Sequence, residues 1–526
     1  MTTSSPTSPK ERNAIRWILF FVIATRVLLL FRSEERIYAR PYLEDSFYLF
    51  NCAEHLAHGD GFTCDGIHPT NGVQPLIVVL YTPLFLIAGA DKVLALRLGF
   101  ILIAICDCLC IILLYKTMRI LQRKPEENLP IWKSPPIIVA SLWAMLYPII
   151  GYTATGMETG LYSLLLLASF FKYVQLQIQR EKSGTLPLGR LITFGIILGL
   201  AVLARVDAVF LVGAIAIYEI SRDKQKGIRT AGIISATSLL ISSPWWIYNY
   251  TTFGSFMPQS GISESLQTGV LAENLRRGAI VIGDLMSVFI YLPSYDLPTW
   301  IFYGWLITLG LFSVWIVRRL SLRKYFSDRY RTNSFTPFIF FCFELVIYYI
   351  FFFSAPHFLP RYFHPLKIIW LMLFASICPP LIERSKKFIS RHKIFGSTIL
   401  GLSFCCAFGF SAWLYVYNFI VIPYPDFYQT GKFALNHPNE RIGMEQAGTA
   451  GFMAPNIVNL DGKVNFDALK ARLGGDIGRY IEDEHLDYIA DNHPLADPML
   501  ASAAKHGGKF VAVDSFGLII LYKRVK

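Results

Sequence analysis

Charged residues are scarce in this sequence. Asp, Glu, Lys and Arg make up 16% of its 526 residues, whereas soluble globular domains carry about 25%. Hydrophobic residues make up 54%, so the composition excludes both a wholly soluble enzyme and a disordered chain. The tail from Ile422 onward has no cysteine and is therefore not a disulfide scaffold. No internal repeat is evident, and such repeats are a frequent sign of secondary transporters.

The charge that is present is mostly basic, with a formal net charge of +12. In a soluble protein this excess suggests a nucleic-acid partner, but in a membrane protein Lys and Arg gather in cytoplasmic loops. More than half of the 49 Lys and Arg residues lie in short segments on one side of the expected membrane. We therefore expect a cytoplasmic N-terminus, an extracytoplasmic C-terminus and no nucleic-acid partner.

About eleven apolar runs are near the 17–25 residues that cross a bilayer, although several are short. The predicted spans are Ala14–Phe31, Arg97–Tyr115, Pro136–Ile150, Gly160–Ile178, Leu191–Ala204, Asp207–Ile220, Thr230–Ile247, Trp300–Val317, Thr336–Ser354, Tyr362–Ile382 and Phe395–Tyr417. Pro75–Ala90 is short and contains Pro83, and treating it as a juxtamembrane or half-crossing helix keeps all basic clusters on one side. Ala279–Leu292 is a second candidate of this kind.

Two polar segments are expected outside the membrane. The first is the loop 32–74 within a helical membrane core that spans residues 1–421. The second is a small α/β domain, residues 422–526, in which the apolar runs shorten to strand length. Phe466–Glu484 is predicted as a helix with two central glycines. The predicted strands are Ile442–Gln446, Ile457–Leu460, Leu486–Ala490, Phe510–Val513 and Leu518–Tyr522.

The outer loop contains the residues best suited to chemistry. Glu44 and Asp45 are adjacent carboxylates close to the first span, where a carboxylate can deprotonate an acceptor hydroxyl at the membrane surface. The alternative is a solvated loop that merely carries charge. His68 is a candidate substrate-binding residue, and Cys52 and Cys64 could form a disulfide. Pro69-Thr70-Asn71-Gly72 reads as an ordered turn that leads into the juxtamembrane helix.

This loop resembles that of the GT-C superfamily, which comprises membrane glycosyltransferases that use polyprenyl-phosphate-linked sugars. The resemblance is closest to a bacterial branch similar to the mycobacterial terminal arabinofuranosyltransferases. Protein mannosyltransferases and lipid A aminoarabinose transferases are more distantly similar. The motifs in the loop are Glu44-Asp45-Ser46-Phe47-Tyr48, Gly59-Asp60-Gly61-Phe62-Thr63 and Pro69-Thr70-Asn71-Gly72.

Further matches extend over most of the chain. They are Gly156–Thr159, Ala204–Asp207, Asn249–Gly254, Met257–Gly261, Pro360–Tyr362 and Asn459–Asn465. Their polar residues are expected at the outer ends of spans, where costly ionisable groups indicate a functional site. The candidate substrate-binding residues are Glu158, Arg205, Asp207, Asn249, Gln259 and Arg361. Two alternatives stay open: a helix-break ion pair between Arg205 and Asp207, and a snorkelling role for Arg361.

The resemblance implies sugar transfer from a polyprenyl-phosphate carrier to a hydroxyl of a glycan, lipid or protein at the outer membrane face, with inversion. The enzyme would be a hexosyl- or pentosyltransferase. Glu44 or Asp45 would be the base, with a slight preference for Asp45, and Arg361 would neutralise the departing phosphate, with or without help from Arg205. The superfamily leaves a Mg²⁺, Mn²⁺ or Ca²⁺ ion open, but no ligand pattern is legible. The rival hypothesis is a transporter or flippase of lipid-linked sugars that performs no bond chemistry.

Overall fold

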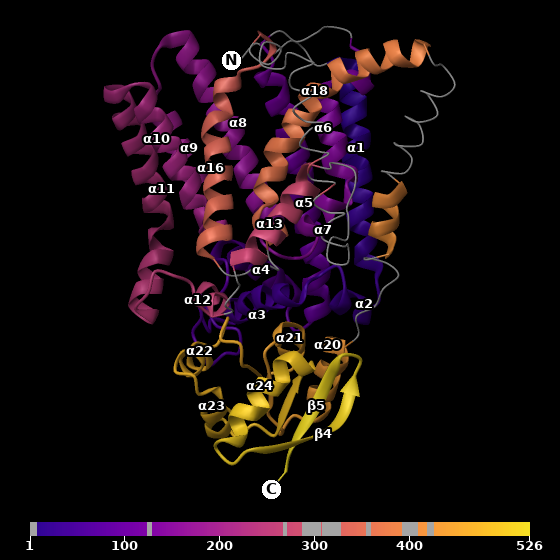
Figure 1. Ribbon diagram of the computed structural model, residues 1–526, viewed down its shortest axis with the longest axis vertical. Coiled ribbons are helices and arrows are strands. Elements are labelled where there is room, and N and C mark those ends of the chain that lie inside the picture. The colour runs from indigo at the N-terminus through magenta and orange to yellow at the C-terminus, as the bar shows by residue number, and fades with distance from the viewer. Residues whose placement is uncertain are drawn as a thin grey trace.

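The molecule consists of a helical bundle and a smaller C-terminal domain at one of its ends (Figure 1). The computed structural model describes residues 8–123, 129–266, 271–286, 304, 307, 328–353, 359–391, 409–417 and 426–525. Long helices run side by side through the bundle, and the short helices α2, α3 and α12 lie between it and the C-terminal domain (Figure 1). The N-terminus and the C-terminus are at opposite ends of the molecule (Figure 1).

The first half of the bundle follows the apolar runs of the sequence closely. Its elements are α1 (Pro9–Val27), η1 (Leu28–Phe31), α2 (Glu34–Ala39), α3 (Glu44–His58), α4 (Pro75–Ala88), α5 (Lys92–Leu121), η2 (Ile131–Lys133), α6 (Pro135–Met145), α7 (Tyr147–Thr153) and α8 (Thr159–Ser183). The predicted span 136–150 is bent by 60° between α6 and α7. Leu146 is extended at this break, and Pro148, the second residue of α7, has no amide hydrogen to donate.

The second half of the described bundle ends in one long helix, α18. Its elements are α9 (Leu188–Ala204), α10 (Ala208–Arg222), α11 (Lys224–Phe253), α12 (Gln259–Ser265), α13 (Leu271–Met286), η3 (Thr332–Ser334), α16 (Thr336–Ile347), η4 (Tyr348–Phe352), α17 (Leu359–Tyr362) and α18 (His364–Arg391). Three predicted segments lie largely or partly outside the described residues: nearly all of Trp300–Val317, most of Phe395–Tyr417 and the end of Ala279–Leu292.

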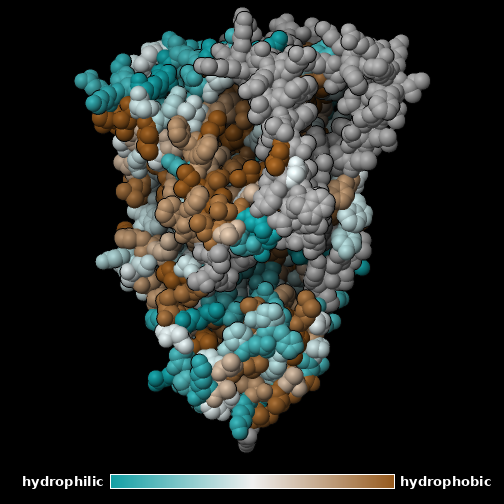
Figure 2. All heavy atoms as spheres, in the orientation of Figure 1, coloured by the Kyte–Doolittle hydropathy of each residue, from teal (hydrophilic) through white to brown (hydrophobic). Residues whose placement is uncertain are grey.

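Several helices are suited to a membrane. Among the described residues, five helices are long and apolar enough to cross a bilayer, or six if α6 and α7 form one bent span. The count of about eleven spans is therefore not confirmed. α4 and α9 are apolar but shorter, so the interpretation of Pro75–Ala90 as a half-crossing helix stays a prediction. Figure 2 shows hydrophobic side chains over the helices on one side of the bundle, between a hydrophilic upper end and the C-terminal domain.

Charges inside the bundle are paired. Asp107 of α5, which has no evident partner in the sequence, accepts hydrogen bonds from Arg26 of α1, and the Nη2–Oδ2 distance is 2.8 Å. Both side chains are about 1% exposed. Glu219 of α10 is likewise buried against Arg180 of α8. Each pair ties together two helices that are distant in the sequence, because an unpaired charge in an apolar interior is very unfavourable.

The C-terminal domain is an α/β domain with a mixed five-stranded sheet, as expected in outline. Its strand order is β2-β1-β3-β5-β4, with β1 parallel to β2 and β3 and the other pairs antiparallel. The strands are β1 (Ile442–Met444), β2 (Ile457–Asn459), β3 (Tyr488–Asp491), β4 (Lys509–Phe516) and β5 (Ile519–Val525). All five lie within a few residues of their predicted positions. The predicted boundary at residues 421 and 422 lies outside the described residues.

The helices of this domain differ from the expectation. Phe466–Glu484 is two helices, because the chain breaks at Gly474 and Gly475, and Gly475 has a positive φ of 72°. The helices are α20 (Asp426–Asn436), α21 (Gly448–Met453), α22 (Phe466–Leu473), α23 (Ile477–Asp483) and α24 (His493–Ala504).

The outer loop holds the two parts of the molecule together. Tyr48 of α3 is buried, and its hydroxyl accepts hydrogen bonds from the Ala447 amide and the Asn459 side chain, both at 3.1 Å. Gly448 packs against the backbone of Glu44, and Gly72 lies against the Lys463 carbonyl. A side chain at either glycine would overlap backbone atoms of the other part.

Gly72→Ala tests how strictly this contact is required. A methyl group there would lie 1.6 Å from the Lys463 carbonyl oxygen, so the C-terminal domain must shift. We expect the free energy of unfolding of the detergent-purified chain, measured by thermal unfolding, to fall by about 1–3 kcal/mol. Gly232→Ala is the control, because nothing lies within 4 Å of its new methyl group and alanine favours the helix. Equal stability of the two variants would contradict the prediction.

Candidate active site

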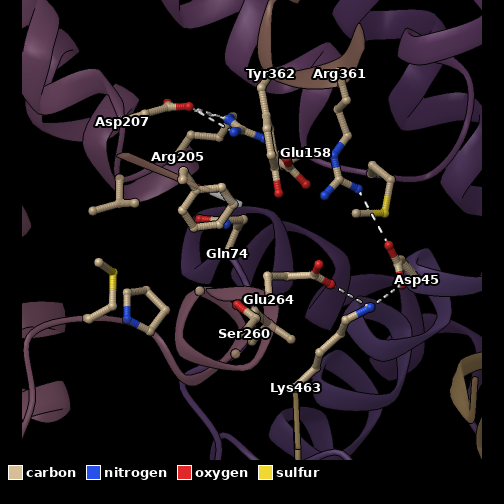
Figure 3. Close-up of a pocket in the computed structure, with 18 of the residues that line it drawn as sticks. Asp45, Gln74, Glu158, Arg205, Asp207, Ser260, Glu264, Arg361, Tyr362 and Lys463 are labelled. Atoms are coloured by element: carbon tan, nitrogen blue, oxygen red, sulfur yellow. Dashed lines mark hydrogen bonds and ion pairs between the residues drawn. The ribbon is translucent and has the colours of Figure 1, made fainter. Parts of the chain in front are cut away.

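A cavity of about 240 Å³ lies where the bundle meets the C-terminal domain. α3 contributes Asp45 and Tyr48, and Gln74 precedes α4. The other labelled side chains in Figure 3 come from the start of α8, the α9–α10 junction, α12, α17 and the loop before α22. They are Glu158, Arg205, Asp207, Ser260, Glu264, Arg361, Tyr362 and Lys463.

Asp45 lies between two cations. Its Oδ2 is 3.7 Å from Nη1 of Arg361, and its Oδ1 is 3.8 Å from Nζ of Lys463 (Figure 3). Both separations exceed the 2.7–2.9 Å of a tight charged hydrogen bond. Asp45 also lies in the first turn of α3, where the helix dipole favours a negative charge. The site therefore favours an ionised carboxylate that faces the cavity.

Arg205 is held much more tightly. Its guanidinium donates to Glu158 Oε1 at 2.6 Å and to Asp207 Oδ2 at 2.8 Å, and Tyr349 donates to the same oxygen of Asp207 at 2.7 Å. The backbone of Arg205 is extended between α9 and α10, so its side chain turns into the cavity wall. The ion pair with Asp207 is thus present, and both residues also line the cavity.

Aromatic rings connect Arg205 to Arg361. The Tyr362 ring stacks on Tyr349 at 4.3 Å between centroids, and the Arg205 guanidinium lies 5.0 Å from the Tyr362 centroid. Arg361 lies 5.5 Å from the same centroid and its side chain is 14% exposed. Such contacts fix the position of a guanidinium while its charge is retained. Arg361 therefore belongs to the cavity wall.

Lys463 brings a charge from the C-terminal domain into the cavity. Its Nζ is 2.9 Å from Glu264 Oε1 and 3.5 Å from Asp461 Oδ2. Burial alone would lower the pKa of Lys463, but the carboxylates of Asp45, Asp461 and Glu264 raise it well above its usual value. This lysine therefore stays protonated at neutral pH.

The Glu44 carboxylate is directed at the C-terminal domain and not into the cavity. It accepts a hydrogen bond from the Gly448 amide of α21, and Glu44 does not line the cavity. Burial and then the neighbouring Asp45 raise the pKa of Glu44 well above its usual value, although Lys463 and the Gly448 amide lower it. Of the adjacent acids, Asp45 faces the cavity and Glu44 joins the two parts of the molecule.

Three other predicted residues also lie away from this cavity. Asn249 donates to the Phe256 carbonyl at 3.4 Å across the α11–α12 turn. Gln259 donates to Thr70 Oγ1 at 2.7 Å and to the Lys463 carbonyl at 3.0 Å, so it supports the cavity wall from behind. The hydrogen bond between His68 and Asp65, 2.6 Å long, raises the pKa of His68. Each of these three side chains is bound to a neighbouring residue of the protein. The sequence motifs could not tell such a structural contact from a contact with substrate.

The sequence did not single out several side chains of the cavity. Lys463 lies in a matched motif of the tail, but no signal there indicated that it meets Asp45. Glu264, Tyr349 and Gln74 are outside any pattern that predicts a site. Among the described residues, no group of three or more His, Cys, Asp or Glu side chains could hold a metal ion. Cys52 and Cys64, which were expected as a candidate disulfide, are free thiols with sulfur atoms 2.9 Å apart.

The fold is that of known membrane glycosyltransferases. No family model and no curated protein matches the sequence. ArnT from Cupriavidus metallidurans in the apo state is similar with a TM-score of 0.58 and 13% identity, over 97% of this chain and 98% of ArnT. Its structure bound to undecaprenyl phosphate has a TM-score of 0.55 and 10% identity, over 96% and 98%.

An archaeal oligosaccharyltransferase has a similar fold. The oligosaccharyltransferase AglB from Archaeoglobus fulgidus, solved with an inhibitory peptide and a dolichol-phosphate, has a TM-score of 0.58 and 11% identity. The match covers 98% of this chain and 74% of AglB. These similarities show that the chain shares its overall fold with ArnT and AglB.

The raised pKa of the half-buried Glu44 carboxyl predicts a pH dependence of stability. An unfolded glutamate ionises above about 4.5, whereas the folded state favours the neutral form, so wild-type stability falls as the pH rises above that value. Glu44→Gln keeps the acceptor for Gly448 but cannot ionise. We therefore expect the thermal midpoint of Glu44→Gln to rise relative to that of wild type as the pH increases from about 4.5 to about 8. The control is Glu35→Gln at an exposed position, whose midpoint should differ from wild type by the same amount at every pH. A difference for Glu44→Gln that does not change with pH would contradict this assignment.

Proposed function

We propose that this chain is a glycosyltransferase that moves a sugar from a polyprenyl-phosphate carrier to an acceptor hydroxyl. The observation that carries the proposal is Asp45 between Arg361 and Lys463 in a cavity at the end of an apolar bundle. A carboxylate suits the removal of an acceptor proton, and cations suit a departing phosphate. The GT-C fold and the undecaprenyl phosphate bound to ArnT support this combination.

Asp45 is the general base in this proposal. The acceptor hydroxyl donates its proton to the Asp45 carboxylate while its oxygen attacks the anomeric carbon of the donor sugar. The bond from that carbon to the phosphate oxygen breaks on the opposite face, which inverts the configuration. Glu44 positions Asp45 through the Gly448 contact and does not touch the substrates.

Arg361 is the proposed partner of the departing polyprenyl phosphate. Its guanidinium lines the cavity beside Asp45 and can present two donors to phosphate oxygens. Arg205 is a positioning residue, because Glu158 and Asp207 already neutralise its charge. Glu158 then presents its carboxylate to sugar or acceptor hydroxyls.

The class of donor sugar and the orientation in the membrane are inferred from the sequence. The motifs place the chain nearest the bacterial branch that is similar to mycobacterial arabinofuranosyltransferases, which makes a pentose or hexose donor the substrate class. The positive-inside pattern places the cavity and the C-terminal domain outside a multi-pass cell membrane, with a cytoplasmic N-terminus. Each step of the proposed mechanism is assigned to a side chain of this chain, with Asp45 between two cations.

Separate substitution of the two adjacent acids tests the mechanism. Asp45→Asn should lower transfer from radiolabelled undecaprenyl-phosphate-linked arabinose, mannose or glucose by about 10²–10⁴-fold, since the base is lost. Glu44→Gln should retain most of the activity. The assay uses detergent-purified chain with a cell-envelope extract as acceptor, and without a membrane a transporter forms no product. Full transfer by Asp45→Asn, or no transfer by wild type, would refute the proposal.

A further inference from the structure

A second polar pocket lies on the other side of Tyr48. It has a volume of about 270 Å³ and lies between α3, the start of α5 and the C-terminal domain. Tyr48 lines both this pocket and the cavity that contains Asp45. The described residues give this pocket no other role.

One stripe of α3 connects the two spaces. Asp45, Tyr48, Asn51, His55 and His58 follow one another at intervals of three or four residues, which places them on one face of the helix. The first two line the cavity, and the last four line the pocket. At 1.5 Å per residue, this stripe extends over about 20 Å, which is the length of several linked sugar rings.

Asn51 points to a ligand. Its side chain lines the pocket and is 4% exposed, but it has no hydrogen-bond partner in the part of the chain that the structure describes. Buried side-chain amides nearly always have partners, since an amide presents two donors and an acceptor. A ligand that offers both an acceptor and a donor would satisfy Asn51.

The charges of the pocket cancel. Glu54 is 2.8 Å from Nζ of Lys92, and Asp65 is bound by His68. His55 is paired with Asp60 at 2.8 Å. The pocket therefore lacks the surplus of positive charge that would select a phosphate, and it presents amide and imidazole groups beside the apolar faces of Met453 and Ile457. Neutral hydroxyl-rich molecules with apolar ring faces, that is saccharides, match these walls.

We propose that this pocket binds a neutral saccharide segment of the acceptor and that Asn51 is one of its hydrogen-bonding residues. The C-terminal domain supplies Asn459 and Gly451 to the opposite wall, so it takes part in acceptor recognition. The term acceptor rests on the proposed function, whereas the binding of a saccharide does not. The shared Tyr48 places the bound segment next to the cavity in which Asp45 lies.

Asn51→Leu separates binding from folding. Leucine has a similar size and sacrifices no hydrogen bond within the described protein, so the thermal midpoint should be kept or raised. The affinity of the full-length detergent-purified chain is measured for maltopentaose, mannopentaose and an arabinofuranose pentamer. Wild type should bind at least one of them, and Asn51→Leu should bind it about fivefold to tenfold more weakly. The control Asn436→Leu, at an exposed position of α20, should bind as wild type does.

The outcomes distinguish this inference from the transferase proposal. Asn51-dependent binding without any transfer by wild type supports the pocket and refutes the transferase. If wild type binds none of the three saccharides, or if Asn51→Leu binds them equally well, the inference is overturned. A marked loss of stability in Asn51→Leu would also overturn it, because it would show that the amide has a structural role.

Discussion

An apolar bundle tolerates charge only where opposite charges meet, and this constraint determines where chemistry can occur in the molecule. Arg26 with Asp107, and Arg180 with Glu219, are closed pairs that serve to connect helices. Around the cavity one carboxylate faces two cations, since Asp45 lies 3.7 Å from Arg361 and 3.8 Å from Lys463. Both cations and the Asp45 carboxylate line the cavity, so a substrate that enters it meets charges of both signs.

The site depends on the C-terminal domain as well as on the bundle. Lys463 provides one of the cations beside Asp45, and the Gly448 amide turns Glu44 away from the cavity. Gln259 binds both Thr70 of the outer loop and the Lys463 carbonyl, so the loop and the domain are fixed to each other. The cavity is therefore a product of docking, and a bundle without its domain would have an incomplete site.

The sequence predicted what local patterns encode. Apolar runs located the long helices of the described bundle, because burial and helix length leave a direct record in composition. The motifs identified Asp45 and Arg361, and both line the cavity. The direction of Glu44 was not predictable, because it depends on a close approach to Gly448, which is 404 residues away. Lys463 and Glu264 were missed for the same reason, because their contact joins distant segments. The partner of Asp107 was not predictable either, since Arg26 meets it only through the packing of α1 against α5.

The central claim is that the cavity receives a lipid-linked phosphate at Arg361, within reach of the Asp45 carboxylate. The most direct test is a cryo-EM structure of the full chain in lipid nanodiscs that contain undecaprenyl phosphate. The account predicts phosphate density inside the cavity, within hydrogen-bond distance of the Arg361 guanidinium. Phosphate bound outside the cavity, or a cavity that stays empty at saturating lipid, would contradict it.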